Sequence, residues 1–264
     1  MAKLRYVRSL EQIKQAQERN PEFLPSTLRS IRCVFETDPR IAAALLPRPL
    51  ELARPEVAVT FSHVVMHLGP QQTLEIGSAI VGVCARYDGV EGTWLVAMPM
   101  STEQAVTGGR ETYGEPKKIA EIEFEREEDR VSAKVSRLGF TWLEARGHLG
   151  AALGPREFIE YGYCVKAMPA CDPGLLIDPE PQLIRLEWRQ KHTGAWRLEQ
   201  GELVLRESPF DPVADLPVRR LVRFEYEEGS SQSNGRVLRT IPGEWFLPFL
   251  HGRYDDPSGT GIEL

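Results

Sequence analysis

Apolar and polar residues alternate with a period of two over most of the chain, which is typical of β-strands that bury one face. The clearest case is the pair of runs at 118–127 and 130–137, which flank Glu128 and Asp129 and predict a hairpin. In all, the pattern predicts about ten strands, at 32–37, 56–68, 73–89, 93–100, 118–127, 130–137, 161–169, 182–190, 194–208 and 218–229.

Helical signals are few and short. A sparse apolar stripe predicts a surface helix over 8–20, and 101–114 begins with cap-type residues and ends in glycines. A further short helix is expected at 38–47, with Asp38 as N-cap and a proline at the first position. The polar stretch 227–236 is the most flexible-looking part of the chain.

The order of these elements predicts the fold class. Strands follow strands without a βαβ rhythm, and no repeat period is visible. We therefore predict a single domain over residues 1–264, of the α+β class and mainly antiparallel β. The sheet is expected to be barrel- or cone-like, with a few short helices attached.

Charge and motif content exclude several function classes. The formal charge of −6 argues against general nucleic-acid binding, which needs a basic face. No apolar window approaches a signal sequence or a membrane span, so a cytoplasmic protein without a membrane partner is expected. Nucleotide-binding glycine motifs and metal-ligand spacings of cysteine are absent from the sequence, so no cofactor and no metal are predicted.

Two adjacent lysines, Lys117 and Lys118, carry the most distinctive chemistry. A lysine forms a Schiff base only when its amine is neutral, which requires burial or a neighbouring cation because its ordinary pKa is about 10.4. In a strand the two side chains point to opposite faces. The alternation does not decide which of them points inward, and spacing alone favours two solvated lysines at a strand start.

Glu75 lies in an otherwise apolar run. By alternation it shares a face with Thr73 and Gly77, which favours a side chain that points to water.

Several segments together resemble the acetoacetate decarboxylase family. The most specific is Gly109-Arg110-Glu111 followed by Pro116-Lys117-Lys118, and weaker likenesses occur at 36–52, 73–80 and 215–218. The resemblance implies that Lys117 is the Schiff-base lysine and Lys118 its neighbour. It further implies that Glu75 is an active-site carboxylate inside the sheet, contrary to the pattern, and that Met98 lies in the pocket. The family also implies a small oxo-acid substrate and a homo-oligomer.

The chain departs from the family at three positions. Leu28 stands where the family has an arginine that meets the substrate carboxylate, although Arg29 and Arg32 are close. Thr60 stands at the position of a second family glutamate, and Glu115 replaces the aromatic residue that usually precedes the proline. The C-terminal segment 240–264 has no counterpart in the resemblance.

These departures leave two reactions open. The resemblance favours decarboxylation of a 3-oxo acid. The alternative is an aldol–dehydration, in which an oxo acid such as pyruvate condenses with an aldehyde and acid–base groups move protons. Glu115, Tyr113 and Tyr254 are the candidates, with Arg29 as a further substrate contact. A Glu115 that faces Lys117 favours the aldol reaction, and one that faces water favours decarboxylation. A non-catalytic binding barrel is the third possibility, against which the intact lysine pair argues.

Overall fold

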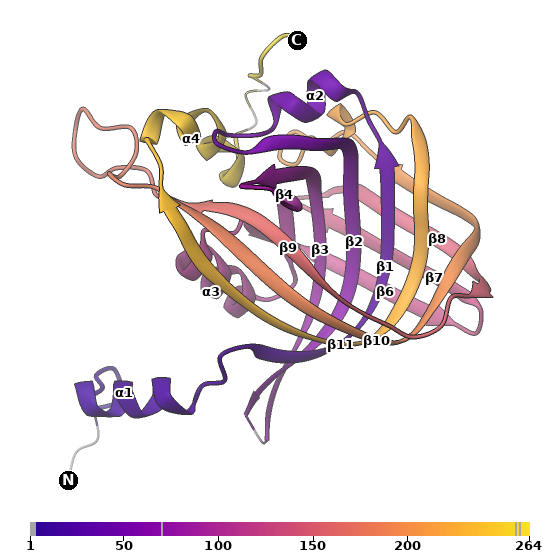
Figure 1. Ribbon diagram of the computed structural model, residues 1–264, viewed down its shortest axis with the longest axis horizontal. Helices are drawn as coiled ribbons and strands as arrows, with labels where there is room; N and C mark the ends of the chain where they lie inside the picture. Colours follow the sequence, from indigo (N-terminus) through magenta and orange to yellow (C-terminus); the bar gives the residue numbers. More distant parts are fainter. Residues whose placement is uncertain (1–3, 70, 257, 259) are drawn as a thin grey trace.

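The computed structural model describes residues 4–69, 71–256, 258 and 260–264. Within these residues, eleven strands form one sheet, with four α-helices and two 3-10 turns attached (Figure 1). The strands are β1 Leu24–Glu36, β2 Glu51–Gly69, β3 Gln72–Tyr87, β4 Val90–Met100, β5 Lys117–Ile119, β6 Glu121–Glu127, β7 Arg130–Arg137, β8 Phe140–Ala152, β9 Arg156–Lys166, β10 Gln182–Leu205 and β11 Arg220–Thr240. The helices are α1 Leu10–Arg19, α2 Pro39–Ala44, α3 Glu103–Tyr113 and α4 Gly243–Leu250, and the 3-10 turns are Val213–Asp215 and His251–Arg253.

The sheet closes into a ring. Its order is β11-β1-β2-β3-β4-β9-β10, and β10 also pairs with β11. From the second half of β10 the sheet continues through β8, β7 and β6. All pairings are antiparallel except the short parallel contacts that β4 makes with β5 and β9. The predicted fold class, a mainly antiparallel cone-like sheet with a few short helices, is confirmed.

Local sequence signals correctly predicted the positions of several elements. The predicted hairpin is β6–β7, and its turn contains Glu128 with a positive φ of 52°. Asp38 caps α2 through a hydrogen bond to the Arg40 backbone N–H at 2.8 Å, as its sequence signature predicts. The continuous strand expected at 118–127 is instead broken at Ala120, because β5 pairs with β4 whereas β6 pairs with β7.

Two other expectations were wrong. The flexible-looking stretch 227–236 is strand, because both of its edges are hydrogen-bonded, to β1 and to β10. Strand β8 was not predicted at all, although it carries the fully buried Trp142 and Leu143. In both cases tertiary pairing overrides a weak local pattern.

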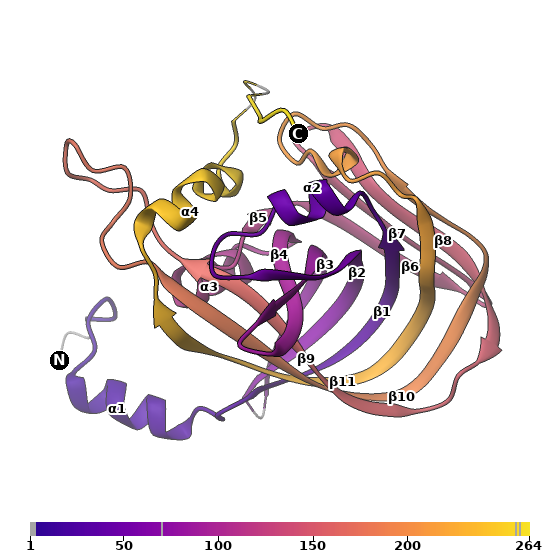
Figure 2. The ribbon, with the colours of Figure 1, turned by 45° about the horizontal axis from the view of Figure 1, so that its top comes forward.

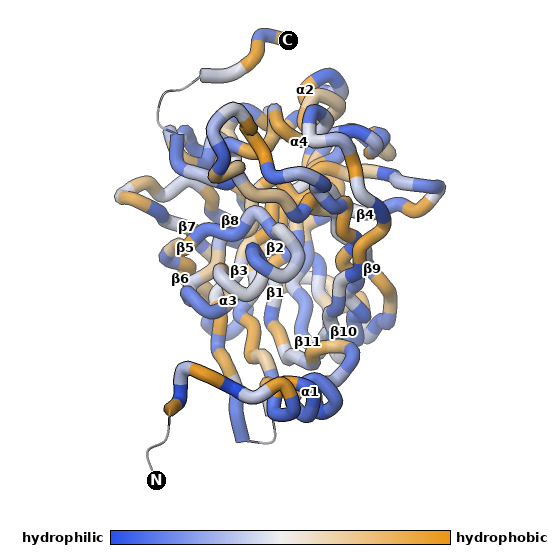
Figure 3. Tube along the Cα trace, turned by 90° about the vertical axis from the view of Figure 1, so that its left-hand side faces the viewer, coloured by the Kyte–Doolittle hydropathy of each residue, from blue (hydrophilic) through white to orange (hydrophobic). Residues whose placement is uncertain are grey.

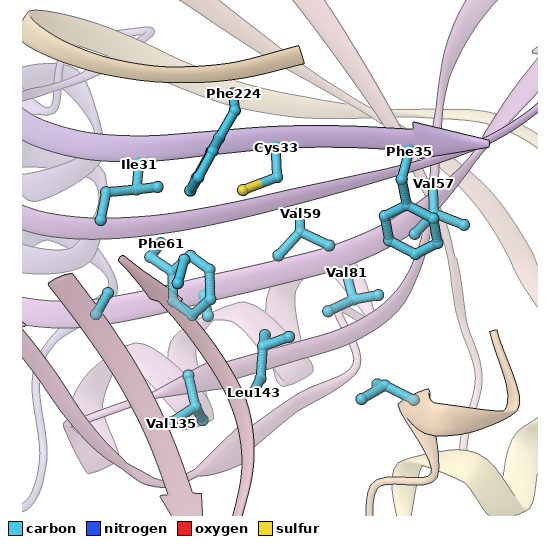
Figure 4. Close-up of a cluster of buried hydrophobic side chains, with 14 of the residues drawn as sticks. Ile31, Cys33, Phe35, Val57, Val59, Phe61, Val81, Val135, Leu143 and Phe224 are labelled. Carbon is cyan, nitrogen blue, oxygen red and sulfur yellow. The ribbon is translucent and has the colours of Figure 1, made fainter. Parts of the chain in front are cut away.

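The largest apolar core lies between β1–β3 and the β6–β8 extension. Figure 4 shows side chains of β1 to β3, such as Ile31, Val59 and Val81, facing Val135 of β7 and Leu143 of β8. Strand alternation sends the next residues of β1 to β3 to the opposite face, which lines the inside of the ring. The residues that alternate with the core residues along β1 to β3 therefore line the interior of the ring.

The C-terminal residues cover one end of the ring. Figure 2 shows α2 and α4 at the same end of the molecule. Phe246 and Leu250 of α4 are buried in a second core with Trp94, and the Phe246 and Trp94 rings meet edge to face at 6.3 Å. Helix α1 lies at the opposite end of the molecule from α2 and α4 (Figure 3), set off from the sheet (Figure 1), and none of its residues is buried. None of the helices in the described part of the chain has the length and apolar character needed to cross a membrane.

Candidate active site

The two lysines sit on a three-residue strand whose position is fixed by a tight turn. Helix α3 ends at Gly114, whose left-handed φ of 71° turns the chain back toward β4. A Cβ at Gly114 would lie 2.4 Å from Lys166 Cα, so only glycine fits against β9 there. Strand β5 then pairs in register with β4, which places Lys117 opposite Met98.

Lys117 points into a buried, largely apolar environment. Its Nζ lies 2.7 Å from Glu115 Oε2, and the two side chains are only 12% and 7% exposed. Met98 belongs to an apolar cluster at this end of the ring, together with Cys164 of β9. Burial, with a further contribution from Glu115, raises the pKa of the Cys164 thiol, so the thiol stays protonated. Glu115 is therefore the acidic group that contacts the Lys117 amine.

A glycine on α3 makes room for this ion pair. A Cβ at Gly109 would lie 2.0 Å from Glu115 Oε2 and 2.6 Å from Lys117 Nζ. Real side chains do not tolerate such distances, so the helix backbone itself forms one wall of the site. Gly109 is the glycine of the Gly-Arg-Glu motif, and its close approach to the Glu115–Lys117 pair gives that motif a physical reason.

Lys118 points to the other face of β5 and is held by several partners. Its Nζ donates to the Phe210 carbonyl at 2.8 Å and to Asp211 Oδ1 at 3.2 Å, and lies 3.4 Å from Asp255 Oδ1. Arg137 pairs with the same two carboxylates. Burial alone would raise the pKa of Asp255, but Arg137 and Lys118 outweigh it and the pKa lies below its ordinary value.

Of the other predicted residues, Tyr113 lies beside the Lys117 pair. Its ring packs where a Cβ at Gly235 would be, and its hydroxyl donates to Asn234 Oδ1 at 3.4 Å. Burial raises the pKa of Tyr113, and Glu115 adds to the effect. Met98, Tyr113 and Glu115 are thus brought together around Lys117.

The implied position of Glu75 is wrong. Its side chain is 72% exposed and its Oε1 lies 2.5 Å from His63 Nε2, on the outside of the sheet. The alternation of β3 is the physical reason, because it turns Ile76 and Ser78 inward instead. The simple pattern was right here, and the position carried over from the resemblance was not.

Arg29 and Tyr254 also lie away from Lys117. Arg29 is exposed on β1. Tyr254 packs under the Arg110 guanidinium, with 5.3 Å between Arg110 Cζ and the ring centre, in a cavity on the Lys118 side of β5. Arg110 in turn donates to the backbone carbonyl of Lys117 at 3.1 Å, so the arginine of the motif orders the strand rather than meeting the amine.

Sequence reasoning missed a second group of buried charges inside the ring. Arg32 donates from Nε to Glu227 at 3.1 Å and from Nη2 to Glu160 at 3.0 Å. His192 is fully buried beside Glu227, and neither of its ring nitrogens makes a hydrogen bond in the described part of the chain. The remaining members are Arg156, Arg223 and Glu225. The sequence signal that could have predicted this group is the occurrence of charged residues at inward-facing positions of long strands.

No metal centre is apparent among residues 4–69, 71–256, 258 and 260–264, where no group of three or more His, Cys, Asp or Glu side chains is arranged to hold an ion. The site at Lys117 instead offers an amine, a carboxylate within proton-transfer distance and a phenol nearby, in apolar surroundings. Such a set can form an imine and move protons around it.

Solved structures share this architecture. A crystal structure of acetoacetate decarboxylase from Legionella pneumophila aligns with a TM-score of 0.69 and 21% identity, over 84% of this chain and 89% of that one. MppR, described as an enduracididine biosynthesis enzyme complexed with the condensation product of pyruvate and imidazole 4-carboxaldehyde, aligns with a TM-score of 0.71 and 16% identity, over 83% and 90%. At these identities the likeness concerns the fold.

Sequence comparison is more specific. Acetoacetate decarboxylase 1 of Bradyrhizobium diazoefficiens is 35% identical over 115 residues, which span 42% of this chain and 45% of that protein. The acetoacetate decarboxylase of Burkholderia vietnamiensis is 27% identical over 204 residues, 73% of this chain and 78% of that one. The family model described as acetoacetate decarboxylase (ADC) matches residues 12–240. This chain therefore belongs to the acetoacetate decarboxylase family.

Proposed function

We propose that this protein is a carbon–carbon lyase that binds a small oxo acid as a Schiff base on Lys117. The observation that carries the proposal is the buried contact of 2.7 Å between Lys117 Nζ and Glu115 Oε2. Two observations support a small oxo acid as the substrate: the family membership of this chain, and the structure of MppR, which shares the fold and is described in complex with pyruvate.

Glu115 accounts for the proton transfers that imine formation needs. The ammonium of Lys117 passes a proton to the Glu115 carboxylate, and the neutral amine attacks the substrate carbonyl carbon. The protonated Glu115 then gives its proton to the carbinolamine hydroxyl, which leaves as water and yields the iminium. The apolar cluster around Met98 and Cys164 excludes bulk water from this exchange.

The inward position of Glu115 favours aldol–dehydration over decarboxylation. Once it has given up its proton, the carboxylate can remove a proton from the carbon next to the iminium, which forms an enamine. The enamine carbon attacks an aldehyde, and Tyr113, whose raised pKa keeps its phenol protonated, is the proposed proton donor to the aldehyde oxygen. In a decarboxylase, an ionised carboxylate at this position would repel the carboxylate of the substrate.

Decarboxylation of a 3-oxo acid is the second candidate. It rests on the family match over residues 12–240 and on relatives described as acetoacetate decarboxylases. In this reaction the iminium accepts the electron pair that carbon dioxide leaves behind, and a protonated Glu115 supplies the proton that completes the product.

Two assays on one preparation separate the candidates. We expect pyruvate and an aromatic aldehyde to give an absorbing unsaturated oxo acid, with slow or no release of carbon dioxide from acetoacetate. Rapid release of carbon dioxide without a condensation product would remove the aldolase assignment. Absence of both reactions, together with no borohydride-trapped adduct from either substrate, would favour a non-catalytic binding protein.

We also propose that the chain forms a homo-oligomer. Helix α1 has no buried residue, and its apolar Leu10 and Ile13 are 76% and 40% exposed. A ten-residue helix with no buried residue is only marginally stable by itself in water, so a second copy of the chain is the proposed cover for its apolar stripe. Light scattering is expected to give a mass of at least two chains, and a monomer at working concentration would contradict this.

A further inference from the structure

A second cavity lies behind the strand that carries Lys117. Its volume is about 510 Å³. One wall is the face of α3 formed by Glu103, Val106 and Arg110, which recur at helical spacing. The lining also includes residues of the C-terminal segment, among them Arg253, and it includes Lys118 but not Lys117. The cavity is therefore separate from the Lys117 site, on the other face of β5.

The cations around this cavity fall into two groups. Lys118 and Arg137 are compensated by Asp211 and Asp255. Arg253, by contrast, is only 7% exposed and has no carboxylate partner in the described part of the chain.

Among the described residues, the groups that contact the Arg253 guanidinium are neutral, and Arg110 is a nearby cation. Arg253 donates to the backbone carbonyls of Val165 and Ala167 and packs on the Phe246 ring. Arg110 donates to the carbonyls of Lys117 and Arg253 and, within the same described residues, forms no ion pair either.

This arrangement leaves buried positive charge without a counter-ion. Burial lowers the pKa of Arg253 to about 10, and the neighbouring Arg110 contributes in the same direction. Buried charges in proteins are normally paired, because desolvation without a partner is unfavourable by several kcal/mol. The only other acid in the cavity wall besides the paired Asp255 is Glu103, which is exposed at the start of α3.

We propose that this cavity binds a small organic anion whose carboxylate or phosphate group pairs with Arg110 and Arg253. The volume is in the range of small-molecule sites, and two guanidinium groups suit a carboxylate or a phosphate. The anion would connect α3 with the C-terminal segment, because Arg110 of α3 already donates to the backbone carbonyls of Lys117 and Arg253. The C-terminal segment lies beyond the family match at 12–240. The proposal does not depend on which reaction Lys117 carries out.

Calorimetric titration of the full chain with inorganic phosphate and with malonate, at constant ionic strength, tests the site. We expect saturable binding of at least one of the two, and the preferred probe tells a phosphate ligand from a carboxylate ligand. Arg253→Gln should weaken binding about tenfold or more, because a charge-assisted contact is lost. Glu103→Gln, at an exposed position that does not threaten folding, should strengthen binding about twofold by removing a nearby negative charge.

Two controls make the outcome decisive. Arg206→Gln removes an arginine that pairs with Glu144 in a different surface groove, and it should leave the affinity unchanged. Lys117→Ala should also bind normally, since Lys117 does not line the cavity. The proposal is overturned if neither anion binds below about 10 mM, if Arg253→Gln binds like the wild type, or if Lys117→Ala abolishes binding.

Discussion

Lys117 and Lys118 are neighbours in sequence, yet they occupy opposite chemical environments. Lys118 is held by a backbone carbonyl and two carboxylates, which Arg137 shares. Lys117 meets one carboxylate in apolar surroundings, against the backbone of Gly109. Three oxygen partners fix Lys118 in place, whereas Lys117 has a single carboxyl partner that can serve as an acid or a base. The number and geometry of the partners, rather than the lysine pair itself, are the basis for proposing Lys117 as the reactive amine.

The largest expected effect is on turnover. Lys117→Ala removes the nucleophile, so the rate should fall by at least about a thousandfold. Lys118→Ala should retain measurable turnover, because its ammonium faces away from Glu115. Steady-state rates of the two variants, each corrected for the folded fraction by circular dichroism, test the contrast. Equal losses would erase the distinction between the two lysines.

The buried cluster of Arg32, Glu160, Glu227 and His192 is another set of mostly paired charges, so it extends the comparison made for the two lysines. Burial, with Arg32 next, lowers the pKa of His192 to about 4, against an unfolded value near 6.5. The unfolded chain therefore binds more protons between these values. Stability should fall by about 3 kcal/mol as the pH drops from 6.5 to 4.

His192→Leu provides the matching variant, since neither ring nitrogen makes a hydrogen bond within the described residues that the change would break, and the 3.2 Å contact of Nδ1 with Glu227 Oε2 is an ion pair only when the ring is protonated. Denaturant unfolding at a series of pH values should show that the variant loses less stability than the wild type across this window. Parallel curves for the two proteins would show that His192 does not titrate as a buried neutral group.

Lys118→Ala should reduce stability more than it reduces activity. Asp211 would keep only Arg137 as a partner, and Asp255 is partly exposed, so we expect a loss of about 2–3 kcal/mol in the free energy of unfolding. Lys134→Ala is the control, because its pair with Glu123 is exposed and should contribute less than about 1 kcal/mol. Urea unfolding measures both, and similar small losses would argue against a structural Lys118 cluster.

Two adjacent glycines of α3 test the close approach at the reactive lysine. Gly109→Ala places a methyl group on the Glu115–Lys117 pair, so the rate should fall about tenfold or more. Gly108→Ala meets no atom within 4 Å and should keep the wild-type rate. Both changes raise helix propensity by about 0.5–1 kcal/mol, so that effect is common to the two variants. A wild-type rate for Gly109→Ala would contradict the tight packing.

The smallest effect is expected at Glu75. Its carboxylate is exposed and paired with His63, so Glu75→Gln should leave both the rate and the adduct yield within about twofold of wild type. The same kinetic assay suffices. A large loss of rate would show that Glu75 reaches the reacting amine after all.

Part of this structure could be predicted from the sequence and part could not. Period-two patterning and turn signals found most strands, since each depends on neighbouring residues. Strand β8 and the strand character of 227–236 depend on partners far along the chain. The Gly-Arg-Glu and Pro-Lys-Lys motifs led to the proposal of Lys117 as the Schiff-base lysine, but no local pattern relates Lys118 to Asp211 and Asp255. The predicted inward position of Glu75 was wrong because it rested on a short likeness to the family, whereas strand alternation indicated a side chain that points to water.

Borohydride trapping tests the central claim most directly. The wild-type chain is incubated with pyruvate or acetoacetate, reduced, digested and mapped by mass spectrometry, alongside Lys117→Ala and Lys118→Ala. We expect one adduct, on Lys117, which Lys117→Ala abolishes and Lys118→Ala retains. An adduct that maps to Lys118, or one that persists in Lys117→Ala, would contradict the assignment of the reactive amine.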